Sequence, residues 1–341
     1  MPHESPDGPL EKLAETPPLA PPAALADPGA AAAAAQGGIG RLWAWLVLLT
    51  MGVSWGLTFS LAKIAADGGA HPLGITFWQA SLGAVFLGAL TVARRRPIAL
   101  DRRMLGLYAA CALLGTVCPG ILFFYAAAHV PAGVLSITVT LVPILTVFLA
   151  ALLGVERLAA GRLLGVLCGM VAVVLLVAPQ GSLPDPGAAP WVLAACAASA
   201  CYAAENLVIA LRKPAGASAF VVACGMYLVA TLVMTPVVLA TDSFVPLPLP
   251  WEAPWGPVEW SIVGMAAISA VAYSLFIYLV GAAGPVFASQ TAYLVTLAGV
   301  LWGMAIFGEE HSLWIWFALI VMLAGLALVS PRRTAARLGA A

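Results

Sequence analysis

Charged residues are scarce in this chain, and their scarcity decides its class. Only 9% of the 341 residues are charged, whereas an ordinary soluble domain has about a quarter. Hydrophobic residues make up 62%, and the mean hydropathy is +1.02. This composition predicts an integral membrane protein surrounded by a lipid bilayer. The net charge is zero, so no large basic surface indicates a nucleic acid partner.

Residues that carry chemistry are also few. The six cysteines fall inside apolar stretches without C-x-x-C spacing, so we interpret them as small buried hydrophobes. A P-loop lysine motif is absent, which argues against nucleotide hydrolysis. There are only four histidines, of which one lies near the start and three in predicted loops: His3, His71, His129 and His311. We therefore expect no cofactor and no bound metal.

Ten apolar segments follow a polar, proline-rich start. Residues 1–40 contain eight prolines and predict a disordered cytoplasmic tail, and residues 332–341 predict a second, shorter tail. A run of about 18 or more apolar residues can cross a bilayer as a helix. We predict ten transmembrane helices at 42–66, 72–93, 104–128, 132–153, 160–179, 189–211, 218–240, 260–281, 285–307 and 313–330.

Part of the chain is repeated. The stretch 125–177 matches 278–330 at a constant offset of 153 residues, which pairs Ser136 with Ser289 and Glu156 with Glu309. Each half, 41–180 and 188–331, then has five helices, and an odd number makes the second half enter the membrane upside down. The predicted fold is all-α, an inverted repeat of five plus five helices, which is typical of transporters.

The basic residues predict the orientation. With the amino terminus inside, fourteen of the fifteen lysines and arginines lie in cytoplasmic segments, and Lys63 is the exception. This bias places both termini in the cytoplasm.

Two ionisable residues lie inside predicted helices. Glu205 could bind a proton or a cationic substrate; alternatively, it is a structural acid hydrogen-bonded to Tyr202, Asn206 or another helix. Lys63 could take part in ion coupling, or its side chain could reach the outer boundary by snorkelling. Lys63 is roughly 30 Å from Arg41, and Glu205 is roughly 10 Å from the cytoplasmic edge, so we do not expect them to pair.

A polar stripe recurs in both halves. Ser136, Thr140 and Pro143 share one face of the fourth helix, and the equivalent positions in the ninth are Ser289, Tyr293 and Thr296. The stripe could line a substrate path, with Pro143 loosening its helix, or it could serve helix packing.

Other positions complete the candidate set. Gln79 adds an uncharged polar group, and Trp55 and the tyrosines, Tyr202 among them, could wall a cavity. Three G-x-x-x-G spacings, at Gly52, Gly165 and Gly299, indicate close helix packing. Glu156 and Glu309 each precede the last helix of their half, where we interpret them as helix caps.

The chain resembles the EamA family of the drug/metabolite transporter superfamily over about residues 40–330. The resemblance is carried by VSWGLTFSLAKIA in the first helix, VLSITVTLVPILTVFLAALLGVERL in the fourth and ASQTAYLVTLAGVLWGMAIFGEE in the ninth. It implies a bacterial inner-membrane carrier with a cavity between its halves, often an exporter of amino acids or other small metabolites, which works by alternating access. The family often has an arginine where this chain has Gln79, which weakens the case for an anionic group bound there.

These observations predict a secondary transporter of small molecules, driven by protons, another ion gradient or the substrate's own gradient. The alternative is a membrane-embedded enzyme acting on a lipid or peptide, although one intramembrane acid cannot form a triad or a metal cluster. A channel is a third interpretation, without a ring of charges to support it. The sequence leaves open whether the protein forms a homodimer.

Overall fold

A computed structural model describes residues 41–155, 160–177, 183, 185–214, 217–248, 254–283 and 291–329. Within those ranges every regular element is a helix. In chain order they are α2 (Arg41–Asp67), α3 (Pro72–Ala93), α4 (Arg102–Ala112), the π-helix η3 (Leu113–Val117), α5 (Cys118–Ala127), α6 (Ala132–Val139), α7 (Leu141–Leu152), α8 (Ala160–Val177), the short 3₁₀-helix η4 (Pro186–Ala188), α9 (Ala189–Arg212), α10 (Ala219–Ala240), α11 (Pro257–Ala283), α13 (Thr291–Phe307) and α14 (Leu313–Val329).

The described residues contain seven helical spans that are long and apolar enough to cross a membrane; Arg102–Ala127 combines α4, η3 and α5, and Ala132–Leu152 combines α6 and α7. Three shorter apolar stretches follow, at Pro257–Tyr273 within α11, Thr291–Phe307 and Leu313–Val329. The prediction of an all-α membrane protein is thus confirmed. The predicted tails, 1–40 and 332–341, lie outside the described residues.

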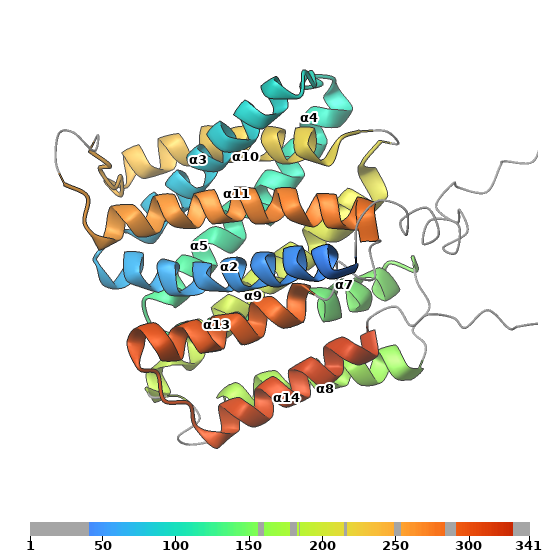
Figure 1. Cartoon of the computed structure of the whole chain (residues 1–341), viewed down its shortest axis with the longest axis vertical. Coiled ribbons are helices and arrows are strands. Elements are labelled where there is room, and N and C mark those ends of the chain that lie inside the picture. The colour runs from blue at the N-terminus through green and yellow to red at the C-terminus, as the bar shows by residue number, and fades with distance from the viewer. Residues whose placement is uncertain are drawn as a thin grey trace, which may run out of the picture.

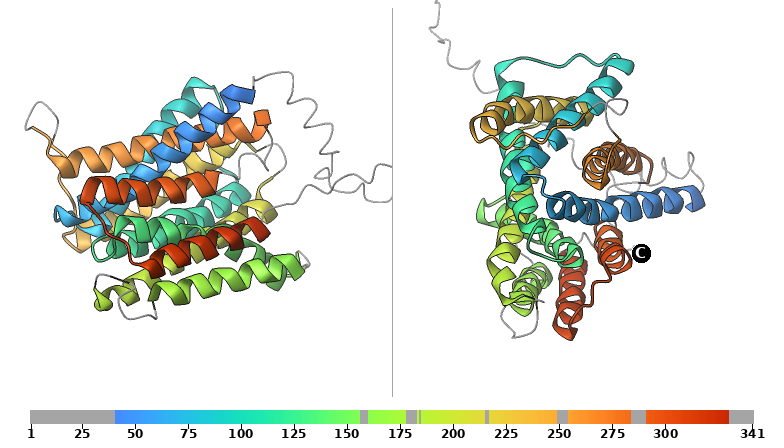
Figure 2. Two further views of the ribbon diagram at one scale, coloured as in Figure 1. Left: turned by 60° about the horizontal axis from the view of Figure 1, so that its bottom comes forward. Right: turned by 90° about the vertical axis from the view of Figure 1, so that its left-hand side faces the viewer.

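The helices run alongside one another in a bundle (Figure 1). The start of α2 and the end of α14 lie at the same end, which also carries the α3–α4 connection with Arg94. The α2–α3 and α13–α14 connections lie at the opposite end, which carries Glu309. We call these the Arg94 end and the Glu309 end. The right-hand view of Figure 2 shows the bundle nearly along its helices, with α3 and α10 at one edge and α8 and α14 at the other.

Small residues let the helices approach closely. Helix α2 packs between α11 and α13, α3 against α10, α8 against α14, and α9 against both α5 and α7. A Cβ atom at Gly56 would overlap Ala298 of α13, and one at Gly165 would overlap the backbone of α14 at Gly325. The G-x-x-x-G spacings therefore serve helix packing, as predicted.

The third and fourth crossings are less regular than the uniform segments predicted from the sequence. The segment predicted at 104–128 contains the π-helical turn η3 between α4 and α5. The segment predicted at 132–153 is interrupted at Thr140, between α6 and α7. Pro143 has no N–H to donate to the carbonyl of Val139, which explains why the interruption falls there. The interruption lies one turn before Pro143, the residue predicted to loosen this helix.

Candidate functional site

Glu205 is the one predicted intramembrane acid, and its carboxyl group lies against the π-helical turn. A Cβ atom at Gly115, the central residue of η3, would overlap the Glu205 carboxylate. The carboxylate of α9 therefore fills the space that the missing side chain leaves. Single π-turns are rare and occur often at functional sites, so this contact marks the region as a candidate site.

The Glu205 carboxylate makes no hydrogen bond or ion pair with any residue that the structure describes. Its neighbour Asn206 points elsewhere and donates from Nδ2 to Thr146 Oγ1 at 3.5 Å. The interpretation of Glu205 as an acid hydrogen-bonded to Tyr202 or Asn206 is thus not what the structure contains. A carboxylate without a protein partner in an apolar bundle is costly to the extent that it is shielded from water, and the Glu205 side chain is partly buried.

Three phenols and one thiol lie in the neighbourhood of this carboxylate. The side chains of Tyr202, Tyr227, Tyr273 and Cys111 all lie within electrostatic range of Glu205. They come from α9, α10, α11 and α4, so helices distant in the sequence converge here. We call these five residues the Glu205 cluster. Tyr202 belongs to the predicted site, whereas Tyr227 and Tyr273 are predicted only as part of the whole set of tyrosines that could wall a cavity.

Gln79 lies next to the cluster. Its Nε2 donates to Ser269 Oγ of α11 at 3.3 Å, and its Oε1 is buried without a hydrogen-bond partner in the described residues. Ser269 is one helical turn from Tyr273, and Gln79 is one turn from Gly83, where an added Cβ would contact the Tyr227 ring. An unpaired acceptor thus lies one helical turn from positions that contact the cluster.

The polar stripe of the fourth helix faces the ninth. Ser136 Oγ donates to the carbonyls of Gly133 at 2.7 Å and Thr296 at 3.1 Å, and the hydroxyls of Thr140 and Thr296 are 2.6 Å apart. Because Thr296 already donates to the Ala292 carbonyl at 2.9 Å, Thr140 is the donor between them. All three hydroxyl residues are buried, so here they join α6 to α13.

The remaining predicted positions are more dispersed. Tyr293 is half-buried on α13, and Ser289 lies outside the described residues. Trp55 is half-buried on α2 and packs against the hydrophobic core. Lys63 Nζ lies 3.2 Å from the Asp67 carboxylate one turn away, toward the Glu309 end. Lys63 therefore does not pair with Glu205, in agreement with the prediction.

Glu309 corrects a prediction. We predicted that it caps the helix that follows it, α14, but it caps α6 of the other half. Its Oε1 accepts from Ala132 N at 2.6 Å and its Oε2 from Gly133 N at 3.0 Å. These are first-turn amides that no residue of α6 itself can satisfy. Glu156, the counterpart of Glu309, lies outside the described residues.

His311 lies beside the Glu309 carboxylate, but its Nε2 makes no hydrogen bond with any described residue. Its Nε2 is 3.5 Å from Glu309 Oε2, and its side chain is 1% exposed. Burial lowers the pKa of His311, and the nearby Glu309 charge only partly opposes that effect. Glu309 also lines a pocket of about 320 Å³ with Lys63, His129 and Asp185. The spacing of histidines in the sequence gave no signal for this contact.

Seven long apolar helices packed into one bundle define an integral membrane protein. A profile of the EamA-like transporter family matches residues 42–178 and 189–330, which is most of the chain and both of its halves. The chain belongs to the EamA-like transporter family, as its resemblance predicted.

Two further similarities were found. A protein of Streptantibioticus cattleyicolor, described as a probable terminal-alkyne amino-acid exporter, is 27% identical over 159 residues, which cover 46% of this chain and 52% of that relative. The match thus spans about half the length of the relative. A protein of known crystal structure is similar in fold, with a TM-score of 0.57 and 22% identity over 85% of this chain and 97% of that one.

Proposed function

We propose that this protein is a secondary transporter of small metabolites in the bacterial inner membrane, where it exports amino acids or related compounds by alternating access. The observation that carries the proposal is the Glu205 carboxylate. It has no protein partner among the described residues, and it lies where helices of both halves of the chain meet. Such a group is available to a substrate or a proton.

Helix packing supports the inverted five-plus-five repeat that this proposal includes. If each helix of the first half has a counterpart in the second, then α3, α6 and α8 pack directly against their own counterparts α10, α13 and α14. In this repeat, helices α2 and α9 are counterparts in the two halves, as are α5 and α11, and α7 and α13. The contact of α2 with α11 therefore corresponds to that of α9 with α5, and the contact of α2 with α13 corresponds to that of α9 with α7. This correspondence is what a twofold axis in the membrane plane predicts. With the basic residues inside, the Arg94 end faces the cytoplasm.

The substrate proposal rests on the chemistry of the Glu205 cluster. The family relative is described as a probable amino-acid exporter, and every amino acid carries an ammonium group. A carboxylate can pair with that ammonium, and tyrosine rings attract cations through their faces. Gln79 offers a free amide oxygen nearby, which accepts hydrogen bonds from the same kind of group.

Alternating access requires contacts that can open at one end. At the Glu309 end, the carboxylate of Glu309 connects the α13–α14 loop to the start of α6. Near the middle, Ser136 and Thr140 connect the interrupted α6–α7 segment to α13. We propose that the Glu309 contacts break when the transporter opens toward the outside, and that Glu205 exchanges its proton or its substrate in that state.

The proposal can be tested with purified protein in proteoliposomes. Uptake of radiolabelled cationic, aromatic and aliphatic amino acids would be measured at several pH values, and the culture medium of cells with and without the protein would be compared by mass spectrometry. We expect at least one amino acid or related metabolite to be transported. Glu205→Gln should lower the initial rate about tenfold or more, because it removes the charge that pairs with the substrate.

Glu310→Gln is the matched control, because Glu310 is exposed and the change in charge is the same. It should transport at the rate of the unmodified protein. If Glu205→Gln keeps the original rate and pH dependence, Glu205 has no role in coupling or binding. If no compound is transported and no metabolite differs in the medium, the transporter proposal itself is wrong.

A further inference from the structure

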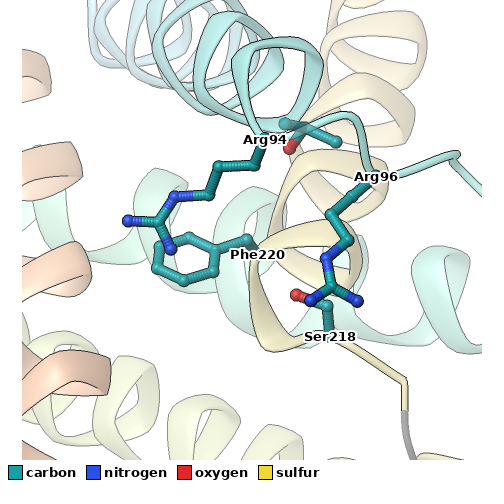
Figure 3. Close-up of a pocket in the computed structure, with 5 residues that line it drawn as sticks. Arg94, Arg96, Ser218 and Phe220 are labelled. Atoms are coloured by element: carbon teal, nitrogen blue, oxygen red, sulfur yellow. The ribbon is translucent and has the colours of Figure 1, made fainter.

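A pocket of about 380 Å³ lies at the Arg94 end, and none of its lining residues belongs to the Glu205 cluster (Figure 3). It lies between the end of α3 and the start of α10, and its lining consists of Thr91, Arg94, Arg96, Ser218 and Phe220. In Figure 3 the Arg94 guanidinium lies over the Phe220 ring and the Arg96 guanidinium lies beside Ser218. Two arginines and a serine therefore line one space, and no carboxylate is part of the lining. This composition is unusual for a bundle in which only 9% of residues are charged.

Both arginines are held in place by local structure. The Arg94 guanidinium lies over the Phe220 ring, 4.7 Å from its centre. Arg95 has a φ of 51°, in the left-handed region where a helix ends most often with glycine. This turn brings Arg96 N to the Thr91 carbonyl at 3.1 Å, which folds the chain back toward α3. The geometry places Arg94 and Arg96 beside the same pocket.

These arginines have no acidic partner. Among the described residues neither Arg94 nor Arg96 forms an ion pair. The acid on the same connection, Asp101, is already used as the amino-terminal cap of α4, where it accepts from the backbone N–H groups of Arg103 and Met104 at 3.0 and 3.1 Å. The positive charge at the pocket is therefore available to an anion.

The start of α10 adds further donors. Ser218 is the amino-terminal cap residue of this 22-residue helix, but its side chain makes no capping hydrogen bond. Its hydroxyl can donate into the pocket, and the first amides of α10 present the positive end of the helix dipole. Bidentate guanidinium groups, a hydroxyl and a helix amino terminus together match the oxygens of a phosphate group.

We propose that this pocket binds a phosphate group, held by Arg94, Arg96 and Ser218 at the start of α10. The source that the surroundings favour is the headgroup of an anionic lipid. Val92 lies near the end of α3, four residues before Arg96, and is 77% exposed. An exposed apolar side chain of the helix surface therefore lies next to Thr91 of the pocket lining. Basic pockets between transmembrane helices on the cytoplasmic side are suited to anionic lipids.

The test uses the full chain, purified in detergent and depleted of lipid. Binding of phosphatidylglycerol, phosphatidylcholine and inorganic phosphate would be measured by native mass spectrometry, together with the midpoint of thermal unfolding. We expect phosphatidylglycerol to bind and to raise the midpoint, and phosphatidylcholine to do neither. The double variant Arg94→Gln/Arg96→Gln should bind phosphatidylglycerol about tenfold more weakly, because two charge-assisted contacts are lost.

Arg102→Gln/Arg103→Gln is the matched control, because it removes two exposed arginines at the same end of the bundle but outside the pocket. It should bind phosphatidylglycerol within about twofold of the original protein. Equal losses in both double variants would mean attraction by net charge alone, which would overturn the proposal, as would binding of phosphatidylcholine equal to that of phosphatidylglycerol.

Two further measurements cover the remaining outcomes. Phe220→Leu keeps both charges but removes the ring beneath Arg94, and it should weaken phosphatidylglycerol binding. This variant remains informative even if the double arginine variant folds poorly. Unchanged binding in both Phe220→Leu and Ser218→Ala would contradict the proposed pocket. Inorganic phosphate that binds by itself and displaces the lipid would support the phosphate chemistry and assign a soluble source. If phosphatidylglycerol binds, and inorganic phosphate neither binds by itself nor displaces it, the ligand of the pocket is the lipid headgroup.

Discussion

Two buried carboxylates in this protein have opposite surroundings. Glu309 accepts two backbone N–H groups of α6 and lies beside His311, so its oxygens are satisfied by the protein. Glu205 lies on Gly115 among tyrosines, and no described residue donates a hydrogen bond to it. A buried charge that is fully hydrogen-bonded stabilises one arrangement of helices, whereas an unpaired one is a cost to the fold. The difference fits a structural role for Glu309 and supports the binding role proposed for Glu205.

Replacement of Glu309 should give the largest loss of stability. Glu309→Ala leaves two amides of α6 without an acceptor, and we expect a loss of about 2–4 kcal/mol in the free energy of unfolding. Glu205→Gln should cause no loss, because it removes an uncompensated charge. Thermal or denaturant unfolding of both variants in detergent checks this contrast. Equal destabilisation by the two replacements would mean that the two sites do not differ as described.

Gly115→Ala tests whether the carboxylate needs the space in the π-helical turn. The added methyl group would displace Glu205, so transport should fall as it does in Glu205→Gln, with a loss of about 1–3 kcal/mol in stability from overpacking. Gly106→Ala is the matched control on α4, because nothing lies within 4 Å of its added Cβ. It should leave transport intact and stabilise the helix by about 0.5–1 kcal/mol. Full transport by Gly115→Ala would contradict the proposed placement.

The hydroxyl contact between α6 and α13 should contribute less than either carboxylate. Thr140→Val and Thr296→Val remove one partner each, and a double-mutant cycle should give a coupling of about 0.6–1.7 kcal/mol, the range for hydrogen bonds between membrane helices. Unfolding of the two single variants and the double variant measures it. A coupling near zero would show that Thr140 and Thr296 do not stabilise one another.

The smallest expected effect concerns pH at the Glu309 end. Because burial lowers the pKa of His311 below 6.5, the unfolded chain binds this proton more readily than the folded one. Stability should therefore be complete above about pH 6.5 and decrease as the pH falls below it. The titratable groups near this end are Glu309, Lys63, Asp67, His129 and Asp185. His311→Gln should flatten the pH dependence of the unfolding midpoint between pH 6.5 and 5; an unchanged slope would assign it to another group.

The helices and the presence of one acid, Glu205, within them could be predicted from the sequence, because hydrocarbon excludes charge and a single acid in an apolar run is conspicuous. The hydrogen-bond partners of Glu309 could not be predicted from the sequence. Ala132 lies 177 residues away in the chain, and only the tertiary fold brings it to Glu309. Periodicity likewise placed Ser136 and Thr140 on one face, but it could not reveal that this face meets Thr296. The π-helical turn has no sequence signal either, since Leu113–Val117 reads as ordinary apolar helix.

Cys111 gives this protein a built-in chemical reporter. Its thiol is completely buried, four residues before Gly115 and within electrostatic range of Glu205. Cys118 is exposed and Cys168, Cys196 and Cys201 are partly exposed, so the other five cysteines would first be replaced by serine. Alkylation of Cys111 by a small reagent then requires the helices around Glu205 to separate. The rate of that alkylation, compared between reagent added outside and inside sealed vesicles, would time the opening of the transporter toward each side of the membrane without any labelled substrate.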